Sequence, residues 1–454
     1  MMQVPHQPVS GTVVALGCAQ ASNAADQGRG IEFMESSVSQ RPAPAWPDRV
    51  ALPVVGPGQG FGFLSGVRVL DLSTSVAGPY AGMLLGDIGA DVIKIERPRT
   101  GDDVRAWGPP FFEGESLWYA AVNRNKRSVT LDIASPRVRA ALETLIKASD
   151  VVLLNQPPRV QKKLGLDAES CRALRPDIIH VSITGFGLQG TRADWPCYDL
   201  IAEGYSGIMD ITGEPDGPAQ KIGAPAADML TGQDAAFAAV GALFERMRTG
   251  KGRSIDVALV ESMTRFLSCR IMPYLGSGEL PRRAGGKDSV IAIYQSFETA
   301  DLPLTLGLGN DAIWKRFWVA VDRPDVGDDT RYDSNAKRRE HRGDIVSLIQ
   351  DILRGKPRDH WLDLFSRNRV PAGPIYRLDE VARDEGLLAR GLFFTLDDGD
   401  RCLPQVGTGF HVDGKPNVPR MAPPRLGAST VDVLRDLAKL GDAEIEALQR
   451  DGLI

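Results

Sequence analysis

The chain has 454 residues, more than one hydrophobic core usually holds, so at least two domains are expected. Its formal net charge of -5 argues against a general polyanion binder, so an anionic ligand would need a local group of Arg and Lys side chains. The 5 cysteines are scattered and lack CxxC or Cys/His spacing, which predicts reduced thiols in a cytoplasmic protein without a zinc site or a disulfide framework.

The first part of the chain predicts an extension followed by a βαβ unit. Residues 1–64 are rich in Pro, Gly, Ser, Ala and Gln without a sustained period, as is typical of a flexible extension. Residues 67–73 then alternate apolar and polar side chains as a strand does. Pro79 suits the first turn of a helix that runs to about Ile88, and Asp91–Glu96 predicts a second strand.

The middle of the chain continues this alternation. Strands are expected at 128–132, 151–154 and 178–183, and a helix at about 137–148 separates the first two of them. Strands that alternate with helices predict a doubly wound α/β sheet.

A long Ala-rich helix is expected next, over Leu230–Thr249, where Gly250 provides a C-terminal stop. A strand at 253–257 and a helix to about Tyr274 follow it. Residues 276–286 are rich in Gly and Pro, which interrupt helices and strands, and this stretch marks an expected domain boundary. A mixed segment then runs to about Pro374, and the last helix is expected over Ala443–Arg450.

A dinucleotide site is the first alternative to consider for such a fold. Glu96 ends the second strand where NAD enzymes place a ribose-binding acid. However, the first turn, Thr74–Tyr80, contains one glycine where the fingerprint needs three. Arg97 and Arg99 follow Glu96 directly and suit a phosphate group. The pattern therefore favours a Rossmann-like fold without an NAD site.

Several segments resemble class III CoA-transferases, the family of formyl-CoA, carnitine and bile-acid CoA-transferases. The resemblance spans about residues 66–454 in the family's order and leaves the N-terminal extension outside it. The segments that carry it are Val67-Arg-Val-Leu-Asp-Leu with Ala77-Gly-Pro79, Gly89-Ala-Asp-Val-Ile-Lys-Ile-Glu96, Asn123-Arg-Asn-Lys-Arg-Ser128 with Leu131-Asp132, Gly185-Phe-Gly187, Ala227-Asp228, Thr249-Gly-Lys-Gly252 and Val370-Pro-Ala-Gly-Pro374.

The resemblance implies a fold and a division of the chain. The fold would be α/β, with a Rossmann-like doubly wound large domain and a smaller α+β domain in an interlocked homodimer. The flexible extension would cover 1–64, the first part of the CoA-binding large domain 65–280 and the small domain 281–380. The C-terminal segment 381–454 would return to the large domain.

Asp228 is the residue on which the functional hypothesis depends. Taken alone, an Asp just before an Ala-rich helix is typical of an N-cap. The resemblance instead implies the nucleophile of a CoA transfer between carboxylic acids, and both roles can hold at once. A carboxylate is already ionised near pH 7 and needs no general base. The implied partners are an acyl-CoA and a small carboxylic acid, with coenzyme A as substrate and no metal or tightly bound cofactor.

Further positions match family residues around coenzyme A. The resemblance implies that Arg97 contacts the nucleotide end, and that Asn155 and Lys163 belong to the same site. Val76, Ala77 and Leu131 would line the thiol arm and the nucleobase region. Without the resemblance, Arg97 can equally be a surface arginine at the end of a strand, and Lys163 can be an ordinary solvated lysine.

Two other functions remain open at this point. The related α-methylacyl-CoA racemases share the fold and the aspartate, but they carry a Gly-His-Asp run where this chain has Cys197, Tyr198 and Asp199. Tyrosine, with a reference pKa near 10, is a poor two-way proton carrier at neutral pH, so Tyr198 and Asp199 favour a transferase. The third possibility is an inactive CoA-binding scaffold, against which the presence of Asp228 argues.

Overall fold

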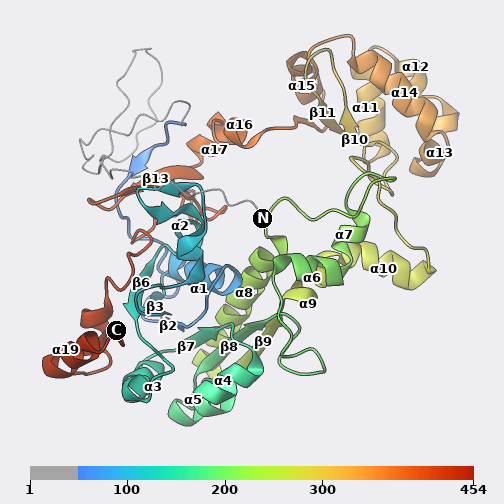
Figure 1. Ribbon diagram of the computed structural model, residues 1–454. Helices are drawn as coiled ribbons and strands as arrows, with labels where there is room; N and C mark the ends of the chain where they lie inside the picture. Colours follow the sequence, from blue (N-terminus) through green and yellow to red (C-terminus); the bar gives the residue numbers. More distant parts are fainter. Residues whose placement is uncertain (1–49) are drawn as a thin grey trace, which may run out of the picture. The chain divides into compact units, whose positions relative to one another are not determined.

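The computed structural model describes residues 50–454, which divide into two units (Figure 1). The larger unit contains the chain up to Cys197 together with Asp228–Leu259 and Ala382–Ile454. The smaller unit contains Tyr198–Ala227 and Val260–Val381. Most of the predicted N-terminal extension, residues 1–49, lies outside the described residues.

A six-stranded sheet, parallel throughout, forms the centre of the larger unit, in the order β6-β3-β2-β7-β8-β9 (Figure 1). This order is doubly wound, because the chain starts in the middle of the sheet and then builds outward in both directions. Its switch point lies between β2 and β7. The strands are β2 Arg68–Asp71, β3 Asp91–Glu96, β6 Lys126–Thr130, β7 Val151–Leu154, β8 Ile179–Thr184 and β9 Arg253–Ala258.

One face of this sheet is apolar. Leu70, Ile93, Val129 and Val152 point to this face and pack against four helices in a single buried cluster. Because side chains alternate along a strand, every second residue reaches this face. The helices are α3 Arg139–Lys147, α5 Ala168–Leu174, α18 Thr430–Asp436 and α19 Asp442–Arg450.

The C-terminal segment supplies two of those four helices and bonds to the edge strand β6. Ser429 N–H donates to the Ser128 carbonyl, and Thr130 N–H donates to Thr430 Oγ1 at 2.9 Å. Asp132 N–H donates to the Leu453 carbonyl at 2.8 Å. The last residues of the chain therefore complete the same core as the first strands.

The other face of the sheet carries α1 (Ala77–Asp87), which contacts β2 and β3. Here the alternating residues include Asp71, Lys94, Glu96 and Lys126, all of them buried. A small three-stranded sheet lies elsewhere in the larger unit, in the order β1-β13-β14. Other elements of the larger unit are β1 Val54–Val55, η1 Asp103–Ala106, β4 Phe111–Phe112, β5 Glu115–Ser116, α2 Leu117–Val122, η2 Pro136–Val138, α4 Pro158–Leu164, α17 Glu385–Ala389, β13 Phe393–Asp397 and β14 Cys402–Val406.

The smaller unit has its own core. An antiparallel sheet, β10-β11-β12, packs with helices around the buried aromatic residues Trp314, Phe317, Trp318 and Phe365. Its elements are α6 Asp199–Ser206, α7 Ile208–Ile211, α10 Ser268–Ser277, β10 Tyr294–Phe297, β11 Leu304–Gly307, α11 Asp311–Ala320, α12 Pro324–Gly327, η3 Thr330–Tyr332, α13 Asn335–Glu340, α14 Arg342–Leu353, α15 Arg358–Arg367, β12 Ala372–Pro374 and α16 Leu378–Val381. Helix α9, Leu259–Phe266, begins with the last residue of the larger unit and continues in the smaller one.

Two expectations need correction. The long helix α8 spans Ala226–Thr249, so it begins four residues before Leu230 and Asp228 is its third residue rather than its cap. Pro225 precedes the helix and Pro is well suited to a helix start, which the sequence interpretation did not use. Cys171, Cys197 and Cys269 form no disulfide bond, as expected, but Cys402 is disulfide-bonded, against the expectation of reduced thiols; Cys18 lies outside the described residues.

Within residues 50–454, every helix is too short or too polar to cross a lipid bilayer.

Candidate functional site

The turn after β2 lies at the switch point of the large sheet, where open α/β sheets bind ligands. Asn155, which follows β7, joins this turn with two hydrogen bonds. Its Oδ1 accepts from the Thr74 N–H at 3.0 Å, and its Nδ2 donates to the Thr74 carbonyl at 2.8 Å. The Asn155 side chain therefore clamps the carboxyl ends of β2 and β7 together.

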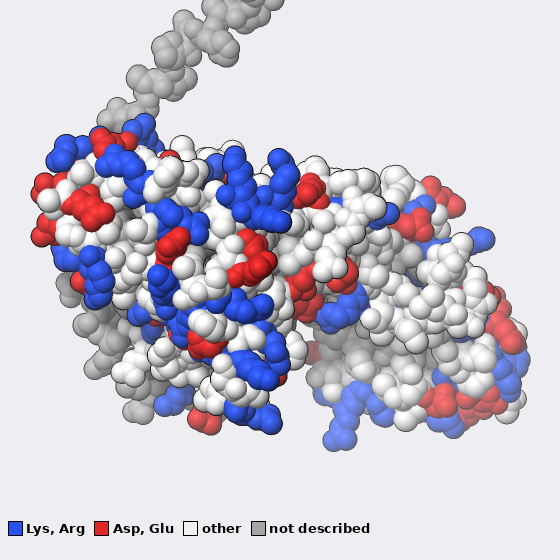
Figure 2. Space-filling model, turned by 90° about the horizontal axis from the view of Figure 1, so that it is seen from below, with Lys and Arg blue, Asp and Glu red and all other residues white. Residues whose placement is uncertain are grey.

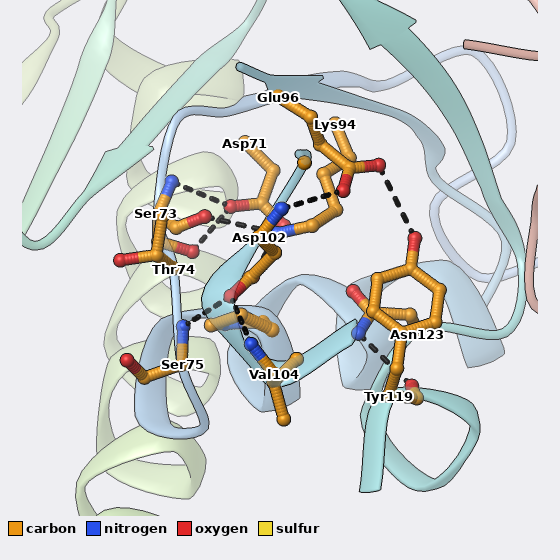
Figure 3. Close-up of polar contacts among 12 residues, drawn as sticks. Asp71, Ser73, Thr74, Ser75, Lys94, Glu96, Asp102, Val104, Tyr119 and Asn123 are labelled. Carbon is orange, nitrogen blue, oxygen red and sulfur yellow. Dashed lines mark hydrogen bonds and ion pairs between the residues drawn. The ribbon is translucent and has the colours of Figure 1, made fainter. Parts of the chain in front are cut away.

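Two buried ion pairs adjoin the same turn, and Figure 3 labels three of their four residues, Asp71, Lys94 and Asp102. Asp71 pairs with Lys126 at 2.9 Å, and Lys94 pairs with Asp102 at 2.8 Å; all four side chains are fully buried. Gly82 of α1 makes room for the first pair, because a Cβ there would lie 2.8 Å from Asp71 Oδ2.

These ion pairs also hold the backbone of the turn. Lys94 Nζ donates to the Ser73 carbonyl at 2.9 Å, and Asp102 Oδ1 accepts from the Ser75 N–H at 2.9 Å (Figure 3). Ser73 N–H and its hydroxyl both donate to Asp71 Oδ1. Burial alone would raise the pKa of Asp71, but the charges of Lys126 and Lys94 and the Ser73 hydrogen bond hold it below its usual value.

Glu96 links this network to the segment that follows β3. Its carboxylate accepts two hydrogen bonds from Arg105, at 2.7 and 2.8 Å, and one from the Ser128 hydroxyl at 2.6 Å. Burial acts to raise the pKa of Glu96, but the hydrogen bonds and charges of Arg105, together with Lys94 and Ser128, lower it to about 2. Glu96, considered above as a possible ribose-binding acid, is thus occupied by protein groups.

The helix that carries Asp228 lies directly against the first turn of α1. A Cβ at Gly232 would be 2.5 Å from the Ala77 carbonyl oxygen and 3.0 Å from the Tyr80 ring, so only glycine permits this approach. Asp228 is four residues earlier and therefore lies on the same face of α8, one turn closer to its N-terminus. The half-buried Asp228 side chain is thus in the helix turn next to the contact with α1, where N–H groups and the helix dipole favour an ionised carboxylate.

Tyr198 and Asp199 belong to the smaller unit, where they begin helix α6. Tyr198 is its N-cap and is 68% exposed. Asp199 Oδ1 accepts a hydrogen bond from the Ala227 N–H at 2.8 Å. Asp199 therefore fixes the backbone of the residue that immediately precedes Asp228 in the chain.

The remaining predicted residues fall into three environments. Val76 and Ala77 are buried at the start of α1, next to the clamped turn. Arg97 and Lys163 are exposed, and Arg97 pairs with Asp103 and donates from Nε to the Gly101 carbonyl at 3.1 Å. Leu131 lies in the apolar cluster on the opposite face of the sheet from Asp71. Val76 and Ala77 thus follow directly after Thr74, to which Asn155 bonds, while Leu131 is not part of that group.

Figure 2 shows basic and acidic side chains interspersed over one side of the molecule, without a wide area of a single charge. Among residues 50–454, His, Cys, Asp and Glu side chains form no group of three or more suited to a metal ion.

The sequence interpretation missed the ionic network and the close approach at Gly232. A signal for the first was present, because Lys94 lies inside the buried strand β3, while Asp71 ends β2 and Lys126 begins β6. A charged side chain in the middle of a buried strand needs a partner of opposite charge. No such local signal marks Gly232, because its neighbour α1 is distant in the sequence.

A profile of CoA-transferase family III matches residues 64–430. The chain belongs to this family. The class III resemblance is therefore confirmed, and CoA transfer is the general reaction of this protein.

Relatives with established names agree with this assignment. A succinate–glutarate CoA-transferase from Agrobacterium fabrum is 40% identical over 395 residues, which cover 85% of this chain and 96% of the relative. A succinyl-CoA:glutarate CoA-transferase from Mus musculus is 35% identical over 398 residues, covering 86% of this chain and 90% of the relative. Both names describe transferases, which favours CoA transfer over racemisation and over an inactive scaffold.

The crystal structure of a CAIB/BAIF family protein from Brucella suis is similar to this chain, with a TM-score of 0.74 and 35% sequence identity. The match covers 84% of this chain and all of the other (100%). The mixed α/β architecture with its large parallel sheet is consistent with the family's fold.

Proposed function

We propose that this CoA-transferase moves coenzyme A between two carboxylic acids through covalent intermediates on Asp228. The observation that carries the proposal is the position of Asp228 in the first turn of α8, one turn from the Gly232 contact with α1. That contact lies beside the turn at the switch point of the sheet, where a ligand of an open α/β sheet is expected.

The reaction follows from the chemistry of an ionised carboxylate. An Asp228 oxygen attacks the donor thioester carbonyl, the C–S bond breaks, and CoA thiolate leaves a mixed anhydride. The thiolate then attacks the aspartyl carbonyl and forms an aspartyl-CoA thioester, releasing the donor acid. The acceptor carboxylate attacks this thioester and regenerates the thiolate and a second anhydride. The thiolate finally attacks the acceptor carbonyl, which releases the new acyl-CoA and the Asp228 carboxylate.

The clamped turn gives coenzyme A a fixed surface. Asn155 and the two buried ion pairs hold residues 73–75 from three directions, so the backbone there is preorganised before substrate binds. Val76 and Ala77 follow directly and suit the apolar part of the thiol arm. Arg97 and Lys163 are exposed cations that suit the phosphates of coenzyme A.

We propose dicarboxylic acids as the substrate class. Succinate and glutarate, in the names of the two relatives above, each carry a second carboxylate. The identity of 40% over 85% of the chain supports the same class here.

We also propose the homodimer that the family resemblance implies, with its division at 1–64, 65–280, 281–380 and 381–454. Helix α8 supports it, because Phe237, Phe244 and Met247 are 81%, 63% and 85% exposed and lie along one side of the helix. Substitution of Phe244 by Asp should yield monomers in light scattering, whereas Val319→Asp, at an exposed apolar residue of α11, should leave dimers. A wild-type chain that is monomeric would contradict this part of the proposal.

The covalent intermediate provides the test of the reaction. After incubation with succinyl-CoA and no acceptor acid, intact mass analysis should show a covalent CoA adduct on the wild-type chain. Asp228→Ala should lose the adduct. Asp432→Ala, which removes an exposed Asp from the first turn of α18, should keep it. An adduct that persists in Asp228→Ala, or its absence from wild type with every dicarboxyl-CoA tried, would contradict the proposal.

A further inference from the structure

Two acids on α6 hold the chain that leads into the nucleophile's helix. Asp199 and Glu203 are four residues apart, so they lie on the same face of this helix. Asp199 Oδ1 accepts from the Ala227 N–H at 2.8 Å, and Glu203 Oε2 accepts from the Ile222 N–H at 2.9 Å. The two carboxyl groups therefore fix both ends of the segment 222–227, whose next residue is Asp228.

Glu203 is an acid that is fully buried, with 0% exposure. Its second oxygen, Oε1, receives no N–H or hydroxyl donor from residues 50–454. One helix turn earlier on α6 lies the carboxyl of Asp199, whose charge and hydrogen bond both raise the pKa of Glu203. Two carboxyl groups can form a hydrogen bond only if one of them carries a proton, and two adjacent anions would repel each other in a buried site.

We propose that Glu203 is a protonated positioning residue, which shares its proton with Asp199 and so holds the segment 222–227 in the geometry that Asp228 needs. This inference rests on the proposed role of Asp228 as nucleophile. It assigns Glu203 no contact with substrate. Glu203 acts through the backbone, because it and Asp199 accept hydrogen bonds from the main-chain N–H groups of Ile222 and Ala227. Gly223 lies between these two groups and has no side chain that could hold the segment.

The electrostatic surroundings support the protonated form. Burial raises the pKa of Glu203, the Ile222 N–H opposes this, and the charge and hydrogen bond of Asp199 raise the pKa further. Lys221, on the segment that follows α7, is the nearby cation and acts in the opposite direction. The net direction is upward, so the neutral acid is favoured over a wider pH range than for an ordinary glutamate.

The test uses two substitutions of Glu203 in the full chain. Glu203→Gln keeps an acceptor for the Ile222 N–H and offers an amide donor to Asp199, so it should keep the wild-type rate of aspartyl-CoA formation at neutral pH. Glu203→Ala loses both bonds and should lower the single-turnover rate and kcat by on the order of 100-fold, with a small change in KM. Glu446→Ala, at an exposed glutamate of α19, is the control for a nonspecific effect.

The pH profile separates the shared proton from a merely structural contact. In wild type, kcat should fall as pH rises through the elevated pKa of Glu203, because the ionised acid repels Asp199. In Glu203→Gln this alkaline decline should disappear, since the amide cannot ionise. Because the pH profile compares wild type with Glu203→Gln, it tests the inference even if Glu203→Ala does not fold.

A wild-type rate in folded Glu203→Ala, or an unchanged alkaline decline in Glu203→Gln, would overturn the inference while the adduct on Asp228 stood. If instead the wild-type chain forms no adduct, or Asp228→Ala retains it, the proposed function itself fails, whatever the Glu203 variants show.

Discussion

The two faces of the six-stranded sheet come from the same strands, but one face carries apolar side chains and the other carries buried charged ones. On one face, Leu70 and Ile93 pack with α3, α5, α18 and α19 in a cluster of hydrocarbon side chains. On the other, the neighbouring residues Asp71 and Lys94 form fully buried ion pairs beneath α1.

This difference indicates separate roles for the two faces. Buried apolar area stabilises a fold directly, whereas a buried ion pair loses most of its Coulomb attraction to desolvation. The ion pairs nevertheless direct their remaining hydrogen bonds to Ser73 and Ser75, in the turn beside the nucleophile's helix. The apolar face accounts for stability, and the ionic face fixes the shape of the binding turn.

The largest expected effect on stability comes from removing one partner of a buried ion pair on the face beneath α1. Asp71→Ala should lower the free energy of unfolding by about 3–5 kcal/mol, because it leaves Lys126 buried without its counter-charge. Adding Lys126→Met should restore roughly 1–3 kcal/mol of that loss, since no lone charge then remains buried. Denaturant unfolding of both variants measures this.

Activity distinguishes the faces within the same experiment. The double variant should still show a raised KM for acyl-CoA, because Ser73 in the turn has lost its two hydrogen bonds to Asp71. Leu142→Ala on the apolar face should cost about 2–5 kcal/mol of stability and leave KM unchanged. If the double variant and Leu142→Ala had equal KM values for acyl-CoA, the two faces of the sheet would not have separate roles in stability and binding.

The next effect is the response of the ionic face to acid. Because the pKa of Glu96 is lowered from 4.5 to about 2, its stabilising contribution is complete above pH 4.5 and is lost as pH falls toward about 2. The contribution amounts to about 3 kcal/mol. Glu96→Gln should therefore flatten the stability curve over this range, measured by denaturant unfolding at each pH. The exposed control Glu446→Gln should leave the curve unchanged, and an unchanged slope in Glu96→Gln would refute the assignment.

The smallest expected effect on stability distinguishes Asn155, which holds the turn, from Lys163, which is proposed to contact the ligand. Asn155→Ala should reduce the free energy of unfolding by about 1–2 kcal/mol, since it removes two hydrogen bonds to Thr74, and should raise KM for acyl-CoA. Lys163 is exposed, so Lys163→Ala should leave stability unchanged and raise KM alone if it contacts a phosphate. Thermal unfolding and initial rates test both, and an unaltered KM for Lys163→Ala would exclude that residue from the site.

Much of this arrangement can be predicted from the sequence, because it depends on local patterns. The strands Asp91–Glu96 and Val151–Leu154 have the predicted limits, since buried parallel strands bounded by helices are strongly marked. The start of α8 was misplaced by four residues, because its first turn contains no strong periodic signal.

The parts that escaped prediction depend on contacts between distant segments. Nothing local tells that Gly232 meets Ala77, that Asn155 clamps Thr74, or that Glu203 holds Ile222. These contacts arise only when the sheet brings separate strands and helices together. The roles of the site residues and the predicted domain limits stay predictions.

One isotope experiment tests the central claim, that Asp228 itself carries the transferred coenzyme A. Turnover of succinyl-CoA with glutarate labelled in its carboxylates with heavy oxygen should place label in the Asp228 side chain. The bridging oxygen of the second anhydride comes from the acceptor and stays on the aspartate when thiolate attacks the acceptor carbonyl. Peptide mass analysis after several turnovers should show the heavy isotope at Asp228. A fully active enzyme whose Asp228 peptide remains unlabelled would contradict the account.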